Sequence, residues 1–443
     1  MKKTLIYILG LFLVFGFFAC EGPLELEPAQ SIDSEKLIVD NASAEVAMNG
    51  LYSNLQDFYG DADLIVTMDI QSDITDHIGT FTSWRDLDEN NPFPDNTSID
   101  DPWNAGYALI YNANVILDVL PGVDDPALDA NRNQFLGEAR TVRALAYFYL
   151  TVLWNDVPLI TNPVTNLDEV NVAPSSQADI ISFITGELNK ALGELGDGGA
   201  ATRVTKGAAN ALLAKIYAYT GDWANASNAA DAVMAGGYTL VANYMSLFDG
   251  TISDEAIFQL DFNSVDANSL AFFYWDTPGG RHEAGPSDFI ANAFDPADAR
   301  SASIIDAPNS PQSPIQVAKY TDFGTGTDKP YIFRLADIML IKAEALAEMG
   351  MYPEATTMLN QVRERSFPGG GVTLDATNFK DLILTERMLE LAWESGNRWY
   401  DLKRTGRAAD VVTANGQDAC KIDLPYIRAE IDANTALNQN PCY

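Results

Sequence analysis

Apolar residues recur with the spacing of α-helices through most of this chain of 443 residues, and this periodicity limits the fold more than any other feature. Residues 41–57 begin with Asn and Ser, which cap helices, and then place apolar side chains on one face. The same pattern predicts helices over residues 103–120, 133–154, 176–195, 205–219, 223–235, 333–349, 353–366 and 377–396. Short strands are expected at Ala256–Phe262 and around Tyr238–Leu240.

Two of the predicted helix pairs share a turn signature. Gly221 and Gly350 each begin the pattern Gly-x-aromatic-x-x-Ala between two helices, which is typical of tetratricopeptide hairpins. The two glycines lie 129 residues apart, so the hairpins are dispersed along the chain. We therefore expect an all-α, tetratricopeptide-like helical-repeat superhelix with minor β segments. Two loop-rich insertions, at about 58–102 and 264–332, hold many Asp, Asn, Pro and Gly residues.

Charge and residue counts exclude several classes of function. The chain has 27 Lys and Arg against 62 Asp and Glu, a formal net charge of −35, so nucleic acid is not expected as a partner. With no CxxC pair, HExxH helix or GxxxxGK[ST] loop, zinc ribbons, zincins and P-loop enzymes are excluded. Only His77 and His282 could serve a Ser-His-Asp triad, and neither lies near a GxSxG elbow. Asp95–Asp101 lacks the EF-loop spacing, so we expect a solvated acidic loop with no metal there, the alternative being a Ca²⁺ site.

The N-terminus predicts export. Two lysines precede an apolar run of about 14 residues that is too short to span a bilayer and ends at Cys20. We expect residues 1–19 to be a lipoprotein signal peptide and Cys20 to carry the lipid anchor, with residues 20–443 as a single domain. In the alternative, an ordinary secretory signal makes Cys20 incidental. Cys420 and Cys442 are predicted to form a disulfide in an oxidising compartment, the alternative being two free buried thiols.

Motifs in a fixed order resemble the SusD/RagB family, the surface nutrient-binding lipoproteins of Bacteroidetes. The segments that carry the resemblance are Leu24–Pro28, Ala47–Tyr52, Trp103–Asn114, Gly137–Phe148, Asp156–Leu159, Ala201–Tyr219, Phe333–Asp337, Ala343–Ala345, Asn360–Arg365, Glu386–Leu391, Gly396–Arg404 and Asn438–Tyr443. Three positions depart from the family pattern: Asn155 and Cys442 replace glycines, and Ile427-Arg428 lacks a second proline. The mixed charges of the later motifs favour structural ion pairs, with Glu344, Glu386 and Glu390 as candidate partners for Arg363, Arg387 and Arg398.

The resemblance implies a function. Family members capture glycans at the cell surface without cleaving them and deliver them to a SusC-like TonB-dependent transporter, so an oligosaccharide ligand, that partner and the outer membrane are expected, with no catalytic residues and no cofactor. A peptide ligand, as in the RagB branch, is the alternative. A glycoside hydrolase with paired carboxylates and a purely structural role beside the transporter are further alternatives.

Aromatic residues in the loop-rich regions are the candidate ligand contacts, because flat apolar rings suit the CH faces of sugars. In the first region Phe81 and Trp84 lie among polar residues that include Asp73. Trp84 also stands where glucan-binding family members carry a platform tryptophan, a transfer by position alone. In the second region Tyr274 and Trp275 end a run of four aromatics, which cannot all face a core. The alternative is that these rings pack into the interior of the helical scaffold and contact no ligand. The tryptophans inside helical motifs, Trp103, Trp154, Trp223, Trp393 and Trp399, are expected in the core.

Overall fold

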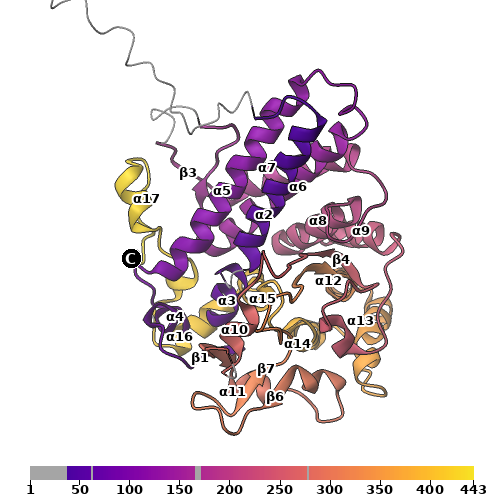
Figure 1. The fold of residues 1–443 in the computed structure, drawn as a ribbon. Coiled ribbons are helices and arrows are strands. Elements are labelled where there is room, and N and C mark those ends of the chain that lie inside the picture. Colours follow the sequence, from indigo (N-terminus) through magenta and orange to yellow (C-terminus); the bar gives the residue numbers. More distant parts are fainter. Residues whose placement is uncertain (1–36, 61–62, 165–170, 277–278) are drawn as a thin grey trace, which may run out of the picture.

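The computed structural model describes residues 37–60, 63–164, 171–276 and 279–443. The predicted signal peptide and Cys20 lie outside the described residues. Four long helices pack side by side in the upper part of Figure 1: α2 (Asn41–Gly60), α5 (Thr97–Val119), α6 (Arg132–Trp154) and α7 (Gln177–Glu194). Helix α6 is buried along nearly all of its length after the first turn.

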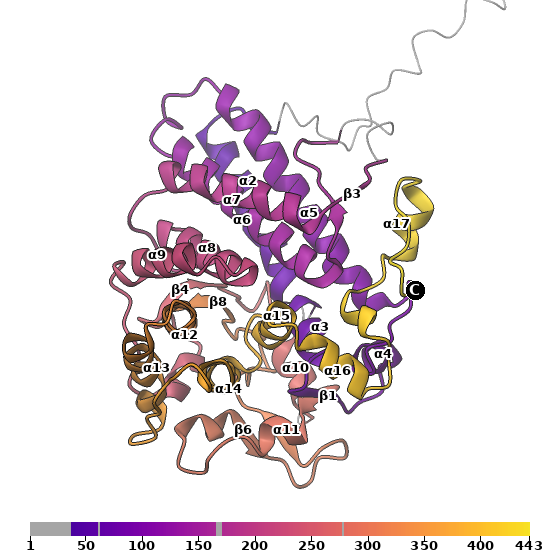
Figure 2. The ribbon, with the colours of Figure 1, turned by 180° about the vertical axis from the view of Figure 1, so that it is seen from behind.

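The two predicted hairpins are present. Helix α8 (Lys206–Thr220) turns into α9 (Trp223–Met234), and α12 (Leu335–Glu348) turns into α13 (Tyr352–Ser366). Gly221 and Gly350 have φ angles of 73° and 80°, a left-handed conformation that favours glycine. Helix α9 packs against α12, so hairpins far apart in sequence are neighbours in space (Figure 2). Contacts running from α7 through α8, α9 and α12 to α13 confirm the predicted tetratricopeptide-like superhelix.

The remaining elements are short. The other helices are α3 (Asp63–Ile70), α4 (Thr82–Asp88), α10 (Leu270–Tyr274), α11 (Asp288–Ala291), α14 (Phe379–Leu391), α15 (Asn397–Arg404), α16 (Ala408–Ala414) and α17 (Arg428–Ala433), with 3-10 turns η3 (Leu120–Gly122), η5 (Tyr244–Phe248), η6 (Ala299–Ser303) and η7 (Ala419–Ile422). The strands are β1 (Thr75–His77), β2 (Val157–Pro158), β3 (Pro174–Ser175), β4 (Ala256–Gln259), β5 (Ala284–Pro286), β6 (Ile304–Asp306), β7 (Ile315–Val317) and β8 (Tyr331–Arg334). They form two-stranded antiparallel sheets in the pairs β1–β5, β2–β3, β4–β8 and β6–β7.

Three local predictions were wrong. Residues 58–102 are not mainly loop, because they contain α3, β1, α4 and the first turns of α5. Residues 64–70 of α3 are all buried, so this helix shows no amphipathic period that a sequence could reveal. No strand forms at Tyr238–Leu240. The helix expected over 377–396 ends at Leu391, because Trp393, Ser395 and Gly396 have φ angles of 59°, 52° and 60° before α15 begins.

One large apolar cluster includes residues from Ile38 to Leu437, near the two ends of the described chain. It contains Trp103, Trp154, Trp393 and Trp399 as predicted, whereas Trp223 is half-buried at the start of α9. Near the C-terminus, Cys420 and Cys442 form a disulfide with Cα atoms 6.0 Å apart. No helix in the described part of the chain has the length and apolar character needed to cross a membrane.

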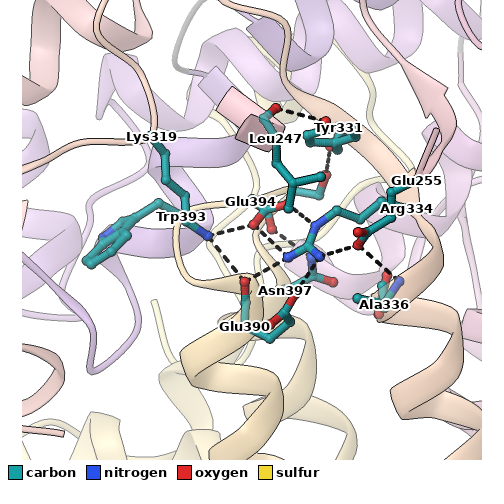
Figure 3. A network of polar contacts seen from close by, with 12 residues as sticks. Leu247, Glu255, Lys319, Tyr331, Arg334, Ala336, Glu390, Trp393, Glu394 and Asn397 are labelled. Atoms are coloured by element: carbon teal, nitrogen blue, oxygen red, sulfur yellow. Dashed lines mark hydrogen bonds and ion pairs between the residues drawn. The ribbon is translucent and has the colours of Figure 1, made fainter. Parts of the chain in front are cut away.

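A buried ion network joins the loop-rich region to the helices (Figure 3). The Arg334 guanidinium lies 2.8 Å from a Glu255 oxygen and 2.7 Å from oxygens of both Glu390 and Glu394, and each of the four side chains is at most 2% exposed. Lys319 adds an ammonium 2.6 Å from Glu394. Burial raises the pKa of Glu390, but Arg365, Arg334 and Arg300 outweigh that effect and hold it far below its ordinary value. The Glu390 carboxylate is therefore ionised, and each of the three carboxylates is paired with Arg334.

The predicted ion pairs were right in one case. Arg363 pairs with Glu386 at 2.6 Å. The other candidates have different partners: Asp401 and Asp337 for Arg387, Asp73 for Arg398, Arg404 for Glu344, and Arg300, Arg334 and Arg365 for Glu390. Sequence spacing identifies charged residues on packed faces but not which elements meet there.

We expect Glu390→Gln to lower the free energy of unfolding by about 3–5 kcal/mol, since it leaves buried arginines without their carboxylate. Urea denaturation followed by circular dichroism measures the change. Asp381→Asn is the control, because Asp381 pairs with Arg407 at the surface and is 72% exposed. The control substitution should lower the free energy of unfolding by less than about 1 kcal/mol. Equal losses in both variants would contradict a stabilising role for the network.

Candidate functional site

A surface cavity of about 530 Å³ lies where α4 and α5 approach α10. Its lining comes from two parts of the chain that are almost 200 residues apart in sequence. The described lining residues are Phe81, Ser83, Trp84, Thr97, Ser98, Asp101, Ser269 and Phe273. Three aromatic rings, four hydroxyls and one carboxylate therefore surround a single space.

Three aromatic rings form one wall of this cavity. The centroids of Trp84 and Phe273 are 4.8 Å apart, and Phe81 lies 5.7 Å from Trp84 and 6.0 Å from Phe273. Trp84 is 8% exposed and so presents a small part of its surface, whereas Phe81 and Phe273 are half-buried. Tilted and edge-to-face contacts of this kind fix the rings against one another. The wall is thus preformed.

The polar side of the cavity is built around the start of α5. Asn96 caps the helix by accepting a hydrogen bond from the Ser98 N–H at 2.9 Å, and its own amide donates to the Ser83 carbonyl at 2.9 Å. The Ser98 hydroxyl donates to that of Ser83 at 2.9 Å. These bonds tie α4 to α5 and place the hydroxyls beside the aromatic wall.

Glu283 holds the two halves of the site together. Its buried carboxylate accepts hydrogen bonds from the N–H groups of Thr80 and Phe81 at 2.6 and 2.8 Å, and from Arg281 at 2.5 Å. The Glu283 N–H donates to the Phe273 carbonyl at 2.9 Å. The Arg281 guanidinium in turn lies 3.9 Å from the centroid of the Phe81 ring. One acidic residue therefore fixes the positions of both Phe81 and Phe273.

The charge state of Glu283 follows from its contacts. Burial alone would raise the pKa of Glu283, but the hydrogen bonds from Phe81, Arg281 and Thr80 outweigh burial and lower it. His77 lies 3.5 Å from the carboxylate, and burial nevertheless lowers the pKa of its imidazole. At neutral pH the site therefore contains an ionised Glu283 beside an uncharged histidine.

Comparison with known proteins agrees with this architecture. A family model described as starch-binding associating with outer membrane matches residues 24–218, and a SusD family model matches residues 313–418. The SusD-like protein P38 of Formosa agariphila is 27% identical over 96% of this chain and 96% of its own. The chain belongs to the SusD/RagB family.

Solved structures share the fold of this SusD/RagB protein. A laminarin-binding SusD-like protein superposes with a TM-score of 0.83 at 24% identity, covering 92% of this chain and 100% of its own. Surface glycan-binding protein A from Bacteroides thetaiotaomicron, solved in complex with laminarihexaose, superposes with a TM-score of 0.78 at 19% identity, covering 90% and 99%. At these identities the likeness establishes the fold.

The structure brings two of the predicted ligand residues together. Phe81 and Trp84 share the cavity, although Trp84 lies on helix α4 and not on a loop. Asp73 lies apart from the cavity lining and is bound by Arg398, with nitrogen–oxygen distances of 2.5 and 2.6 Å. Trp275 is half-buried against Phe323, with ring centroids 6.1 Å apart.

Tyr274 does not fit its predicted role. It is fully buried, and its ring stacks on Tyr320 at 6.1 Å. In helix α10, Tyr274 faces the core while its neighbours Phe272 and Phe273 face outward. This agrees with the prediction that the four aromatic residues do not all face the core. Phe273 is therefore the member of this aromatic run that sequence reasoning should have selected. A helical reading of residues 270–274 would have separated the two faces.

We expect Glu283→Gln to lower the melting temperature at pH 7 and to have a progressively smaller effect as the pH falls below the unfolded-state pKa of about 4.3. The folded-state pKa of Glu283 is lowered, so its stabilisation is present above the unfolded value of about 4.3 and is lost as pH falls through the folded value. Thermal denaturation from pH 3 to pH 8 measures the difference. Glu89→Gln is the control, since Glu89 is 58% exposed on the neighbouring surface. A destabilisation by Glu283→Gln that is constant across this range would show that the charge is unimportant.

Proposed function

We propose that this protein binds an oligosaccharide in the cavity between α4, α5 and α10 and does not cleave it. The observation that supports this proposal is the preformed aromatic wall of Phe81, Trp84 and Phe273 facing a rim of hydroxyl groups. Aromatic faces pack on the CH groups of sugar rings, and hydroxyls both donate to and accept from sugar hydroxyls. The description of the matching family model as starch-binding supports the same ligand class.

The acid content of the cavity favours binding over hydrolysis. A glycoside hydrolase needs two carboxyl groups about 5–10 Å apart across the scissile bond. Among the described residues that line the cavity, Asp101 is the one carboxylic acid. The lining residues that the structure describes therefore offer no pair that could act as acid and base or as acid and nucleophile.

We expect alanine at Trp84 or Phe273 to weaken glycan binding by about tenfold or more, because each substitution removes a central ring of the wall. The test is calorimetry and native gel retardation of residues 21–443 with laminarin, starch and other polysaccharides. Laminarin is included because it is named for one structural relative. Trp275→Ala and Phe289→Ala are the matched controls, since these rings lie outside the cavity and Phe289 is 51% exposed.

The outcomes separate the competing functions. Binding that is lost in the cavity variants and kept in both controls supports the proposal. Retention of peptides in place of glycans would favour the RagB-like alternative. Normal glycan uptake by cells that carry Trp84→Ala would favour a structural role beside a transporter.

We also propose that the protein is a lipoprotein of the outer membrane that delivers its ligand to a SusC-like TonB-dependent transporter. The N-terminal segment, with two lysines before an apolar run that ends at Cys20, supports the anchor. The family description as associating with the outer membrane supports the location. Two acyl chains on one cysteine hold a protein at a bilayer without a spanning helix.

We expect Cys20→Ala to move the protein from the membrane fraction to the soluble fraction of cells, because it removes the acylated thiol. Fractionation followed by immunoblotting measures the shift. Cys420→Ser is the control, since it removes a cysteine that lies far from the N-terminus and belongs to the disulfide. Unchanged membrane recovery of Cys20→Ala after a salt wash would contradict the lipid anchor.

A further inference from the structure

The chain segments around the cavity carry far more acids than bases. Between residues 71 and 119, which include α4 and α5, Arg85 is the only lysine or arginine, whereas nine residues are Asp or Glu. Residues 262–280, which include α10, contain no lysine or arginine. Asp101 is the one charged side chain among the described residues of the cavity lining. The field at the cavity is therefore set by carboxylates.

The nearest cations already have acidic partners. Arg85 lies 3.0 Å from Asp86 and is 51% exposed. Arg281, stacked on Phe81, lies 2.5 Å from the buried Glu283. A sulfate or carboxylate ligand is normally bound by arginine or lysine through charge-assisted hydrogen bonds. An anionic ligand in this cavity would have to compete with Asp86 for Arg85 and with Glu283 for Arg281.

On the side of the cavity where α5 begins, the nearby cation is also paired with an acid. The Arg428 N–H donates to the Pro94 carbonyl at 2.9 Å, and its guanidinium lies 3.4 Å from the carboxylate of Asp95. The remaining polar lining consists of hydroxyls, which suit uncharged sugar hydroxyls.

From this arrangement we infer that the cavity selects uncharged glycans and rejects sulfated or uronic-acid-containing ones. The inference rests on the proposed function and adds the ligand class. Aromatic contacts supply affinity for any sugar ring, while the negative field of Asp101 and its neighbours opposes a ligand anion that finds no available cation. Discrimination thus comes from an unfavourable contact with the wrong ligand.

The test compares one glycan in two charge states on residues 21–443, which is the predicted mature chain without Cys20. Laminarin, or the neutral polysaccharide of the panel that binds best, is measured by calorimetry beside its sulfated derivative from the same batch. We expect the sulfated form to bind about tenfold or more weakly at low salt. The difference should shrink as NaCl rises, because the Debye length falls from about 30 Å at 0.01 M to about 3 Å at 1 M.

Asp101→Asn should reduce the discrimination, and Asp118→Asn is the matched control. Both changes remove one acid from the same helix, but the two residues stand 17 positions apart, which places Asp118 about 25 Å away along α5. If the two variants reduce the discrimination equally, selection comes from the net charge of the protein and not from the cavity, which overturns the inference.

The remaining outcomes distinguish this inference from the proposed function. Equal or tighter binding of the sulfated glycan overturns charge selection and leaves glycan capture standing. Binding of neither form overturns glycan capture and the inference with it. Tight binding of the neutral form alone, with discrimination reduced in Asp101→Asn and kept in Asp118→Asn, supports both.

Discussion

The buried pairing of Arg334 with Glu255, Glu390 and Glu394 is the interaction on which the rest of the structure depends (Figure 3). Removing these charges from water costs several kcal/mol for each ion, and only close, complete pairing offsets that cost. The network therefore tolerates very few relative positions of the elements that contribute to it. It fixes β4, β8 and α14 against one another at the centre of the molecule.

The same network is connected to the candidate site through the loop-rich region 264–332. Lys319 binds Glu394, and the hydroxyl of the adjacent Tyr320 donates to the Trp393 carbonyl at 2.8 Å. Tyr320 stacks on Tyr274, which belongs to α10, the helix that carries Phe273 into the cavity. Tyr274, which the sequence suggested as a ligand contact, thus positions the ring beside it. A long segment with little regular structure is ordered because its buried polar groups have specific partners.

Much of the scaffold was predictable, for an identifiable reason. The helices at 41–60, 132–154 and 206–220 follow from apolar spacing and capping residues, which are local properties. Gly221 and Gly350 identified both hairpins because a left-handed turn residue favours glycine. Helix α3 and the break after Leu391 were missed, since the first has no polar face and the second depends on contacts with distant residues.

The candidate site shows where local information ends. The sequence by itself determined the helical repeats, the acidic character of the surroundings, the paired thiols as candidates and the aromatic composition of residues 81–84 and 272–275. Only the tertiary structure decided that Phe273 and not Tyr274 meets Trp84, that Asp73 pairs with Arg398, and that Glu283 joins the two segments. The reason is physical: periodicity is set between residues a few positions apart, whereas the cavity forms between segments almost 200 residues apart. Their approach is fixed by hydrogen bonds from the N–H groups of Thr80 and Phe81 to the buried Glu283 carboxylate.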